Sequence, residues 1–146
     1  NSLWEAGYAV DTMETACDWP RVTPMMEAME EAGRQALARH GEKTHCYTHL
    51  SHVYAQGSSV YSTFVYRIGP DYDIALARWQ SLKQSVGNAI AAHGGTITHQ
   101  HGVGKDHAPW FQLEKGPANL AAIGAVIREW DQKGVMAPGN LLGDIS

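Results

Sequence analysis

The chain has 146 residues, enough for one compact domain with its own core but short for two. Its hydrophobic share of 44% and charged share of 18% are those of an ordinary globular protein, which excludes extensive disorder. The net charge is -4 with no dense cluster of Lys or Arg, and no apolar run is long enough to cross a bilayer, so we expect neither a nucleic acid partner nor an integral membrane segment.

The first part of the chain predicts a strand and a helix. Residues 10–17 alternate apolar and polar side chains, as in a strand with two different faces. Thr23 and Pro24 have the chemistry of a helix start, and apolar side chains that include Met25 and Met29 then recur at helical spacing until Gly41. The methionines are therefore expected in the core.

The middle of the chain predicts a hairpin and a second helix. Residues 44–53 and 59–67 are rich in β-branched and aromatic side chains, and the link 55–58 has turn chemistry, so they are expected to pair in an antiparallel hairpin. A second helix is expected to start at Asp71 and to end at Gly94.

A short strand over residues 96–99 completes the order strand, helix, strand, strand, helix, strand. This order is that of the ferredoxin-like arrangement, an antiparallel sheet with both helices on one face, and it predicts the α+β class. Two further helices are expected over 108–115 and 117–130, and a turn-rich tail over 134–140.

The cysteines and the start of the chain indicate its context. Cys17 and Cys46 are expected to be free thiols of a cytoplasmic protein, because a disulfide framework normally needs more cysteines in a chain of this size. The chain begins without Met, inside a helical pattern that includes Leu3 and Tyr8, so we expect it to be a piece of a longer protein.

The stretch GGTITHQHGVGKDH, residues 94–107, combines imidazoles with bare backbone. His99, Gln100 and His101 are followed directly by Gly102 and Gly104. Glycines let a flat or charged ligand approach the main chain, and imidazoles exchange protons near neutral pH. The pattern fits a loop at the edge of a cofactor, and it equally fits a glycine-rich turn with solvated histidines.

A second polar cluster lies in the predicted hairpin: His45, Cys46, His49, His52 and Tyr54. Because side chains of a strand alternate between faces, His45 and His49 are expected on one face and the other three on the opposite one. The cluster also lacks the paired spacing of a zinc site, so we predict no metal. Tyr54, at the hairpin tip, either donates its phenol into a pocket or packs.

Carboxylates of the first strand are not expected to act together. Asp11 and Glu14 fall on opposite faces of residues 10–17, which argues against a paired-carboxylate acid and base. Lys105 is either solvated or faces an anionic substrate.

The string GGTITHQHGVGKDHAPW, with SHVYAQGSSVYSTFVY before it and KGVMAPGNLL after it, resembles the C-terminal domain of FAD-linked oxidases, the vanillyl-alcohol-oxidase-type flavoproteins. Within them it is most similar to alkyl-dihydroxyacetonephosphate synthases and their bacterial relatives. The resemblance spans nearly the whole chain, 1–146. It implies that FAD is the cofactor of the full-length protein, held mostly by an N-terminal FAD-binding domain that this chain lacks, and that this domain forms the substrate side for a small molecule.

The resemblance also implies site residues in the hairpin, the loop and the tail. Those expected to be catalytic are Tyr54, His99 and His101. Those expected to lie against the cofactor are Gln100, Gly102, Gly104 and Asn140. Gln100 stands where the synthases have the central histidine of a triple-His loop.

Two alternatives remain open at this point. FAD-linked D-2-hydroxy-acid (lactate or glycolate) dehydrogenases resemble the chain too, but they carry a metal-binding Glu where Gln100 stands; His49 matches their first hairpin histidine, and Tyr61 stands about where the second is. The other alternative is a non-catalytic ferredoxin-like module that binds a small ligand or forms a homodimer through its sheet.

Overall fold

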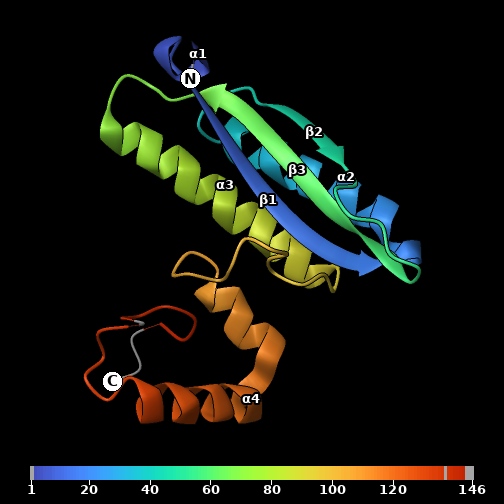
Figure 1. Ribbon diagram of the computed structural model, residues 1–146. Coiled ribbons are helices and arrows are strands. Elements are labelled where there is room, and N and C mark those ends of the chain that lie inside the picture. Colours follow the sequence, from blue (N-terminus) through green and yellow to red (C-terminus); the bar gives the residue numbers. More distant parts are fainter. Residues whose placement is uncertain (1, 137, 144–146) are drawn as a thin grey trace. The chain divides into compact units, whose positions relative to one another are not determined.

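A computed structural model describes residues 2–136 and 138–143 (Figure 1). The chain divides into two compact units, Asn1–His99 and Gln100–Ser146. Among the described residues, no helix combines the length and the apolar character that crossing a membrane requires.

The first unit contains a three-stranded antiparallel sheet and its helices. The strands lie in the order β1-β3-β2, with β3 paired to both neighbours. The strand bounds are Tyr8–Asp18 for β1, His45–His49 for β2 and Gly57–Arg67 for β3. The helix bounds are Ser2–Glu5 for α1, Trp19–Ala38 for α2 and Tyr72–Ala92 for α3.

Both long helices pack on the same face of the sheet, as the ferredoxin-like arrangement requires. On β1 this face carries Asp11 and Met13, and Lys83 of α3 reaches Asp11 at 3.0 Å. On β3 it carries Ser62 and Phe64, and Ser62 contacts Met29 of α2. The predicted α+β class and the one-sided helix layer are therefore confirmed.

The predicted fourth strand is wrong. The Thr96 N–H donates to the Ala16 carbonyl at 3.3 Å and the His99 N–H donates to the Glu14 carbonyl at 3.2 Å, so residues 96–99 run antiparallel beside β1 without becoming a regular strand. The Thr96 hydroxyl also donates to the Thr98 carbonyl at 3.4 Å. Local side-chain bonds of this kind compete with a sheet ladder. The segment nevertheless brings His99 to the edge of β1.

The start of the first long helix also differs from the prediction. Helix α2 begins at Trp19, after Asp18 in an extended conformation and with Pro20 in its first turn, so Pro24 lies inside the helix. Proline suits the first turn of a helix because the N–H groups of that turn have no partner within the helix. In the sequence, Pro20 and Pro24 satisfy this condition equally well. The predicted helix start relied on Pro24, the second of these two prolines, and is therefore too late in the chain.

The core lies between this helix layer and the sheet. Its largest fully buried side chains include Phe64 and Met13 of the sheet, Met25 and Met29 of α2, and Leu82 of α3. The expectation that Met25, Met26 and Met29 are core residues is confirmed for Met25 and Met29, whereas Met26 is half-buried. Cys17 and Cys46 are free, as predicted.

We expect Gly33→Ala to destabilise the fold by roughly 1–3 kcal/mol, the usual cost of overpacking a tight core. A Cβ at Gly33 of α2 would lie 2.3 Å from Cε1 of Phe64, whose ring is fully buried. Urea unfolding measures the loss. The double variant Gly33→Ala/Phe64→Leu should lose less than the two single losses added together, because the smaller side chain makes room; simple additivity would contradict the steric explanation.

The second unit is mostly helical. Helix α4 (Ala108–Trp130) is interrupted at Gly116, which has a positive φ of 71° and a non-helical ψ of 167°. The two helical segments on either side of Gly116 match the predicted helices 108–115 and 117–130. The tail is hydrogen-bonded to the rest of this unit. The Gln112 side chain donates to the Leu142 carbonyl at 2.9 Å, and the Leu141 N–H donates to the Gly104 carbonyl at 3.0 Å.

Candidate active site

The chain leaves strand geometry after His49, and this departure shapes the site. The prediction of a strand through residue 53 is wrong, because β2 ends at His49. Hydroxyl groups of β3 take over from the ladder: the His52 N–H donates to the Ser59 hydroxyl at 2.8 Å, and the Ser58 hydroxyl donates to the His52 carbonyl at 2.8 Å. Backbone pairing with β3 resumes at the isolated Val53–Ser58 bridge, so residues 50–56 form a loop whose side chains do not follow the alternation of β2.

This loop presents Tyr54 to His99. The Tyr54 hydroxyl lies 3.0 Å from Nε2 of His99, and the two rings meet edge to face with centroids 6.0 Å apart. The Trp19 indole N–H donates to the Tyr54 carbonyl at 3.2 Å, which anchors the loop to the start of α2. The structure thus brings together a phenol and an imidazole from chain segments 45 residues apart.

On its other side, His99 faces a buried carboxylate. Nδ1 of His99 lies 3.2 Å from Oε1 of Glu14, whose side chain is only 3% exposed. The Glu14 carboxylate accepts a hydrogen bond from the Nδ1–H of His99, which leaves Nε2 as the acceptor for the Tyr54 hydroxyl. Tyr54, His99 and Glu14 form a continuous line that we call the relay.

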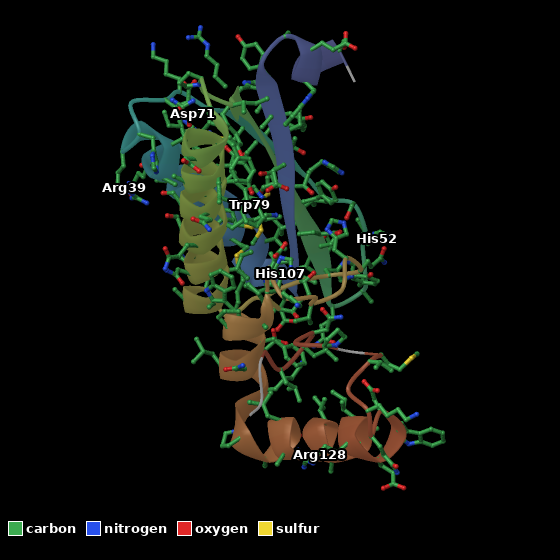
Figure 2. The ribbon with its side chains drawn as sticks, turned by 90° about the vertical axis from the view of Figure 1, so that its left-hand side faces the viewer. Arg39, His52, Asp71, Trp79, His107 and Arg128 are labelled. Carbon is green, nitrogen blue, oxygen red and sulfur yellow. The ribbon has the colours of Figure 1, made fainter. Side chains whose placement is uncertain are left out.

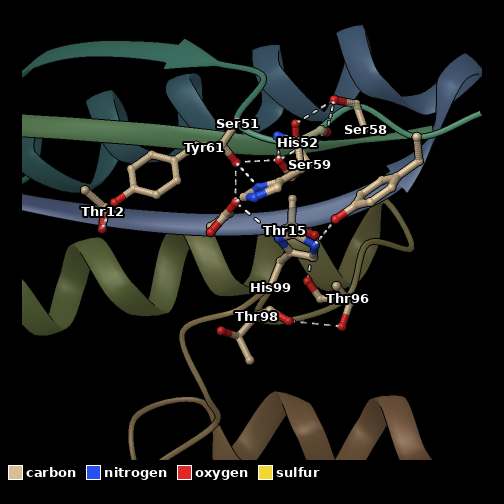
Figure 3. A network of polar contacts seen from close by, with 12 residues as sticks. Thr12, Thr15, Ser51, His52, Ser58, Ser59, Tyr61, Thr96, Thr98 and His99 are labelled. Carbon is tan, nitrogen blue, oxygen red and sulfur yellow. Dashed lines mark hydrogen bonds and ion pairs between the residues drawn. The ribbon is translucent and has the colours of Figure 1, made fainter.

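Hydroxyl groups and a second imidazole surround the carboxylate (Figure 3). Ser51 makes a short hydrogen bond to Oε1 of Glu14, and its oxygen lies 2.5 Å from that of Ser59. Nδ1 of His52 lies 3.2 Å from the Ser51 oxygen and 3.9 Å from Oε1 of Glu14. Oε1 of the buried carboxylate therefore has a hydroxyl and two imidazoles near it.

His52 consequently lies on a different face than predicted. Glu14 pairs with Tyr61 of β3, and Tyr61 pairs with His49 of β2, so these three residues share the face opposite the helices. His52 joins Glu14 on that face, away from Trp79 of α3 (Figure 2). The predicted alternation does not hold because the pairing with β3 shifts by one residue between His49–Tyr61 and Val53–Ser58.

Sequence reasoning placed Glu14 on the correct face but gave it no role. The signal it missed is the position: a carboxylate in the middle of a strand is buried by its neighbours, and a buried charge needs partners. Only contacts 37 and 85 residues away along the chain, with Ser51 and His99, reveal those partners.

The neighbouring thiol is not a competing nucleophile. Cys17 lines a surface hollow together with Tyr54, Gly57 and Ser58. Burial, reinforced by the Asp18 carboxylate, raises the pKa of the Cys17 thiol. A thiol that stays protonated near neutral pH is a poor nucleophile.

The sheet face next to the relay offers a surface for a flat ligand. Val10 and Thr12 of β1 and Val65 of β3 lie on the side away from the helices, and none of them is fully buried. The Tyr61 hydroxyl donates to the Thr12 hydroxyl at 3.3 Å, which keeps the tyrosine ring along the sheet. Small branched side chains in a row suit the face of a planar ring.

The remaining predicted site residues belong to the second unit. Gln100, Gly102 and Gly104 all have left-handed backbones, at φ 63, 75 and 56. A Cβ added at Gly102 or Gly104 would meet nothing within 4 Å, so both glycines present open main chain. A left-handed Gln100 costs roughly 1–2 kcal/mol, and such strain is typical of functional loops.

His101 and Asn140 are placed within the same unit. His101 is exposed, and Asn140 lies in the tail next to Leu141, which binds the loop at Gly104. The expected roles of His101, of Asn140 and of the loop glycines toward a cofactor stay predictions.

Comparison with known proteins gives a consistent picture. A family model described as FAD linked oxidases, C-terminal domain, matches residues 1–141. An alkyldihydroxyacetonephosphate synthase of Trypanosoma brucei brucei is 26% identical over 132 residues, which cover 90% of this chain and 21% of that protein. The synthase of Caenorhabditis elegans is 27% identical over 140 residues, with 93% and 23% covered.

A bacterial relative and solved structures complete the comparison. The uncharacterized FAD-linked oxidoreductase YgcU of Escherichia coli (strain K12) is 25% identical over 133 residues, with 89% of this chain and 27% of that protein covered. A solved alkyldihydroxyacetonephosphate synthase matches 68% of this chain and 18% of its own length, with a TM-score of 0.59 and 19% identity. This likeness shows a shared fold. The chain spans 21–27% of the length of these curated relatives.

Proposed function

Since the chain belongs to the family of FAD-linked oxidase C-terminal domains, we propose that it forms the substrate-side wall of the flavin site in a larger FAD-dependent enzyme of the alkyl-dihydroxyacetonephosphate synthase type. The observation that carries the proposal is the relay: a phenol, an imidazole and a buried carboxylate in one hydrogen-bonded line. It lies at the edge of a sheet face that suits a flat ring.

The residues present fit one side of a flavin. Val10, Thr12 and Val65 would hold the flat isoalloxazine ring, and Tyr54 and His99 would serve the substrate beside it. A bound flavin would supply the electron-accepting chemistry, and the protein supplies position and proton transfer.

The relay moves one proton at the substrate. Tyr54 takes a proton from the substrate as its own proton passes to Nε2 of His99, and the reverse movement returns it. Glu14 holds the proton on Nδ1 throughout, so it fixes the tautomer and stabilises the imidazolium that forms. Ser51 and Ser59 orient the carboxylate.

Two features of the chain bear on the choice of substrate. A synthase-type reaction on acyl-dihydroxyacetone phosphate is the reading that the curated relatives support. The 2-hydroxy-acid dehydrogenase alternative needs a pair of hairpin histidines, and here the ring of His49 stacks on the ring of Tyr61 with centroids 4.9 Å apart. A phenol ring in that place does not act as the second imidazole ligand.

The full-length protein is expected to carry bound flavin and to act on acyl-dihydroxyacetone phosphate in preference to lactate or glycolate. The absorption spectrum of the purified protein tests the first point, and initial rates on the two substrate classes test the second. A colourless protein that does not respond to added FAD would contradict the proposed enzyme. Turnover of 2-hydroxy acids alone would replace the synthase reading with the dehydrogenase one.

A further inference from the structure

Three residues of the first unit converge in a way that the proposed proton relay does not require. Glu14 comes from β1, His52 from the loop after β2, and His99 from the segment after α3. Each offers one ligand atom, and these atoms lie within 4.8 Å of one another. We call Glu14, His52 and His99 the carboxylate–imidazole cluster.

The spacing matches that of metal ligands. Protein nitrogen and oxygen atoms bind zinc at about 2.0–2.2 Å in a tetrahedron, which places two ligand atoms roughly 3.4 Å apart. In the cluster, Oε1 of Glu14 lies 3.2 Å from Nδ1 of His99 and 3.9 Å from Nδ1 of His52. A shift of a few tenths of an ångström in the half-exposed His52 ring would close the larger gap.

The ligands are also oriented from behind. A metal-binding imidazole usually has its other nitrogen held by a polar partner, and Nε2 of His99 has the Tyr54 hydroxyl at 3.0 Å. The Glu14 carboxylate is fixed by Ser51, and the backbone of His52 is held by the Ser59 hydroxyl at 2.8 Å. Supported ligands lose little freedom when an ion binds.

The charges favour a cation. The Glu14 side chain is 3% exposed, and the imidazoles of His52 and His99 lie 3.9 and 3.2 Å from its Oε1. An imidazole is neutral or cationic depending on the proton. One carboxylate with two neutral imidazoles is the ligand set of catalytic zinc sites. Burial makes a compensating positive charge at this carboxylate favourable.

We propose that Glu14, His52 and His99 bind one divalent cation of the zinc class through Oε1 and the two Nδ1 atoms. His52 is 44% exposed, so the ion has a path from solvent and a fourth position open to water or a ligand. The ligand set shares no member with His49, Tyr61 and Gln100, the positions that the resemblance to hydroxy-acid dehydrogenases singled out. The ion takes the place of the proton on Nδ1 of His99, and Nε2 then carries the remaining hydrogen and accepts none from Tyr54. The metal-bound state is therefore an alternative to the relay state and goes beyond the proposed function.

Equilibrium dialysis of the full-length protein against Zn²⁺, with a chromophoric chelator as competitor, tests the proposal. We expect one more ion per polypeptide in the parent protein than in Glu14→Gln or His52→Ala, whose affinity should fall by at least about a hundredfold. His49→Ala removes an exposed histidine of the same sheet face and is the matched control. It should bind as the parent does. Co²⁺ in the same site should give the intense visible absorption of tetrahedral cobalt.

Separate control measurements distinguish a loss of folding from a loss of metal binding. Far-ultraviolet circular dichroism and the unfolding midpoint establish that each variant is folded, and His52→Ala changes a half-exposed side chain outside the core. Equal Zn²⁺ binding by parent, Glu14→Gln and His52→Ala would overturn the inference, as would an equal loss in His49→Ala. Flavin content and activity are measured in the same samples. If the protein is yellow and active but Glu14→Gln and His52→Ala bind Zn²⁺ as the parent does, the metal site is contradicted and the proposed function is not.

Discussion

Tyr54→Phe in the full-length protein is expected to lower kcat by about 10²–10⁴-fold, the usual contribution of a positioned acid or base. The variant keeps the ring that lies edge-on to His99 and removes only the hydroxyl that donates to Nε2. Because the side chain is half-exposed, the fold should not suffer. Steady-state kinetics on acyl-dihydroxyacetone phosphate measure the loss, and the flavin spectrum establishes that the cofactor is still held.

Tyr47→Phe is the matched control for this prediction. Tyr47 lies on β2, on the same side of the sheet as His49, and is exposed at 48%. Its hydroxyl has no place in the relay, so the control should keep kcat and KM within a factor of about two. If Tyr54→Phe retained the parent's kcat, the phenol would not be the proton-transfer group.

Glu14→Gln is expected to reduce kcat by about 10³-fold with little change in KM. The amide is nearly isosteric with the carboxylate, but it neither stabilises an imidazolium nor enforces the proton on Nδ1 of His99. In serine proteases the comparable loss of a carboxylate behind a histidine costs roughly 10⁴ in kcat through the wrong tautomer. Glu14 thus acts as a positioning residue, since it works through His99.

Asp11→Asn separates this effect from a general disturbance of β1. Asp11 lies on the opposite face of the same strand, where it pairs with Lys83 of α3 at 3.0 Å. The substitution should lower the free energy of unfolding, because it weakens a half-buried ion pair, and it should leave kcat unchanged. If Asp11→Asn lowered kcat as much as Glu14→Gln does, the loss of kcat would be due to a disturbance of strand β1 and not to the relay.

The sequence predicted those features that depend on local pattern. Alternation along β1 correctly placed Glu14 on the face opposite Met13, and the helical repeat correctly buried Met25 and Met29. The break in α4 at Gly116 was also visible, because Pro117 restarts the helix.

The errors occur where distant groups decide the local structure. The pairing register shifts by one residue between the His49–Tyr61 pair and the Val53–Ser58 bridge, and this puts His52 on the face of Glu14. The same holds for residues 96–99, whose bonds to β1 and to each other replace a regular strand. A carboxylate 85 residues from its imidazole has no local signature. Family resemblance pointed to Tyr54 and His99, and only the coordinates supplied Glu14.

The most direct test of the central claim is a crystal structure of the full-length protein with FAD bound. We expect the flavin ring to lie along the face of Val10, Thr12 and Val65, with the Tyr54 hydroxyl facing the space above the ring and no other side chain between them. A flavin that lies against the helix side of the sheet, or that is separated from Tyr54 by another layer of protein, would contradict it.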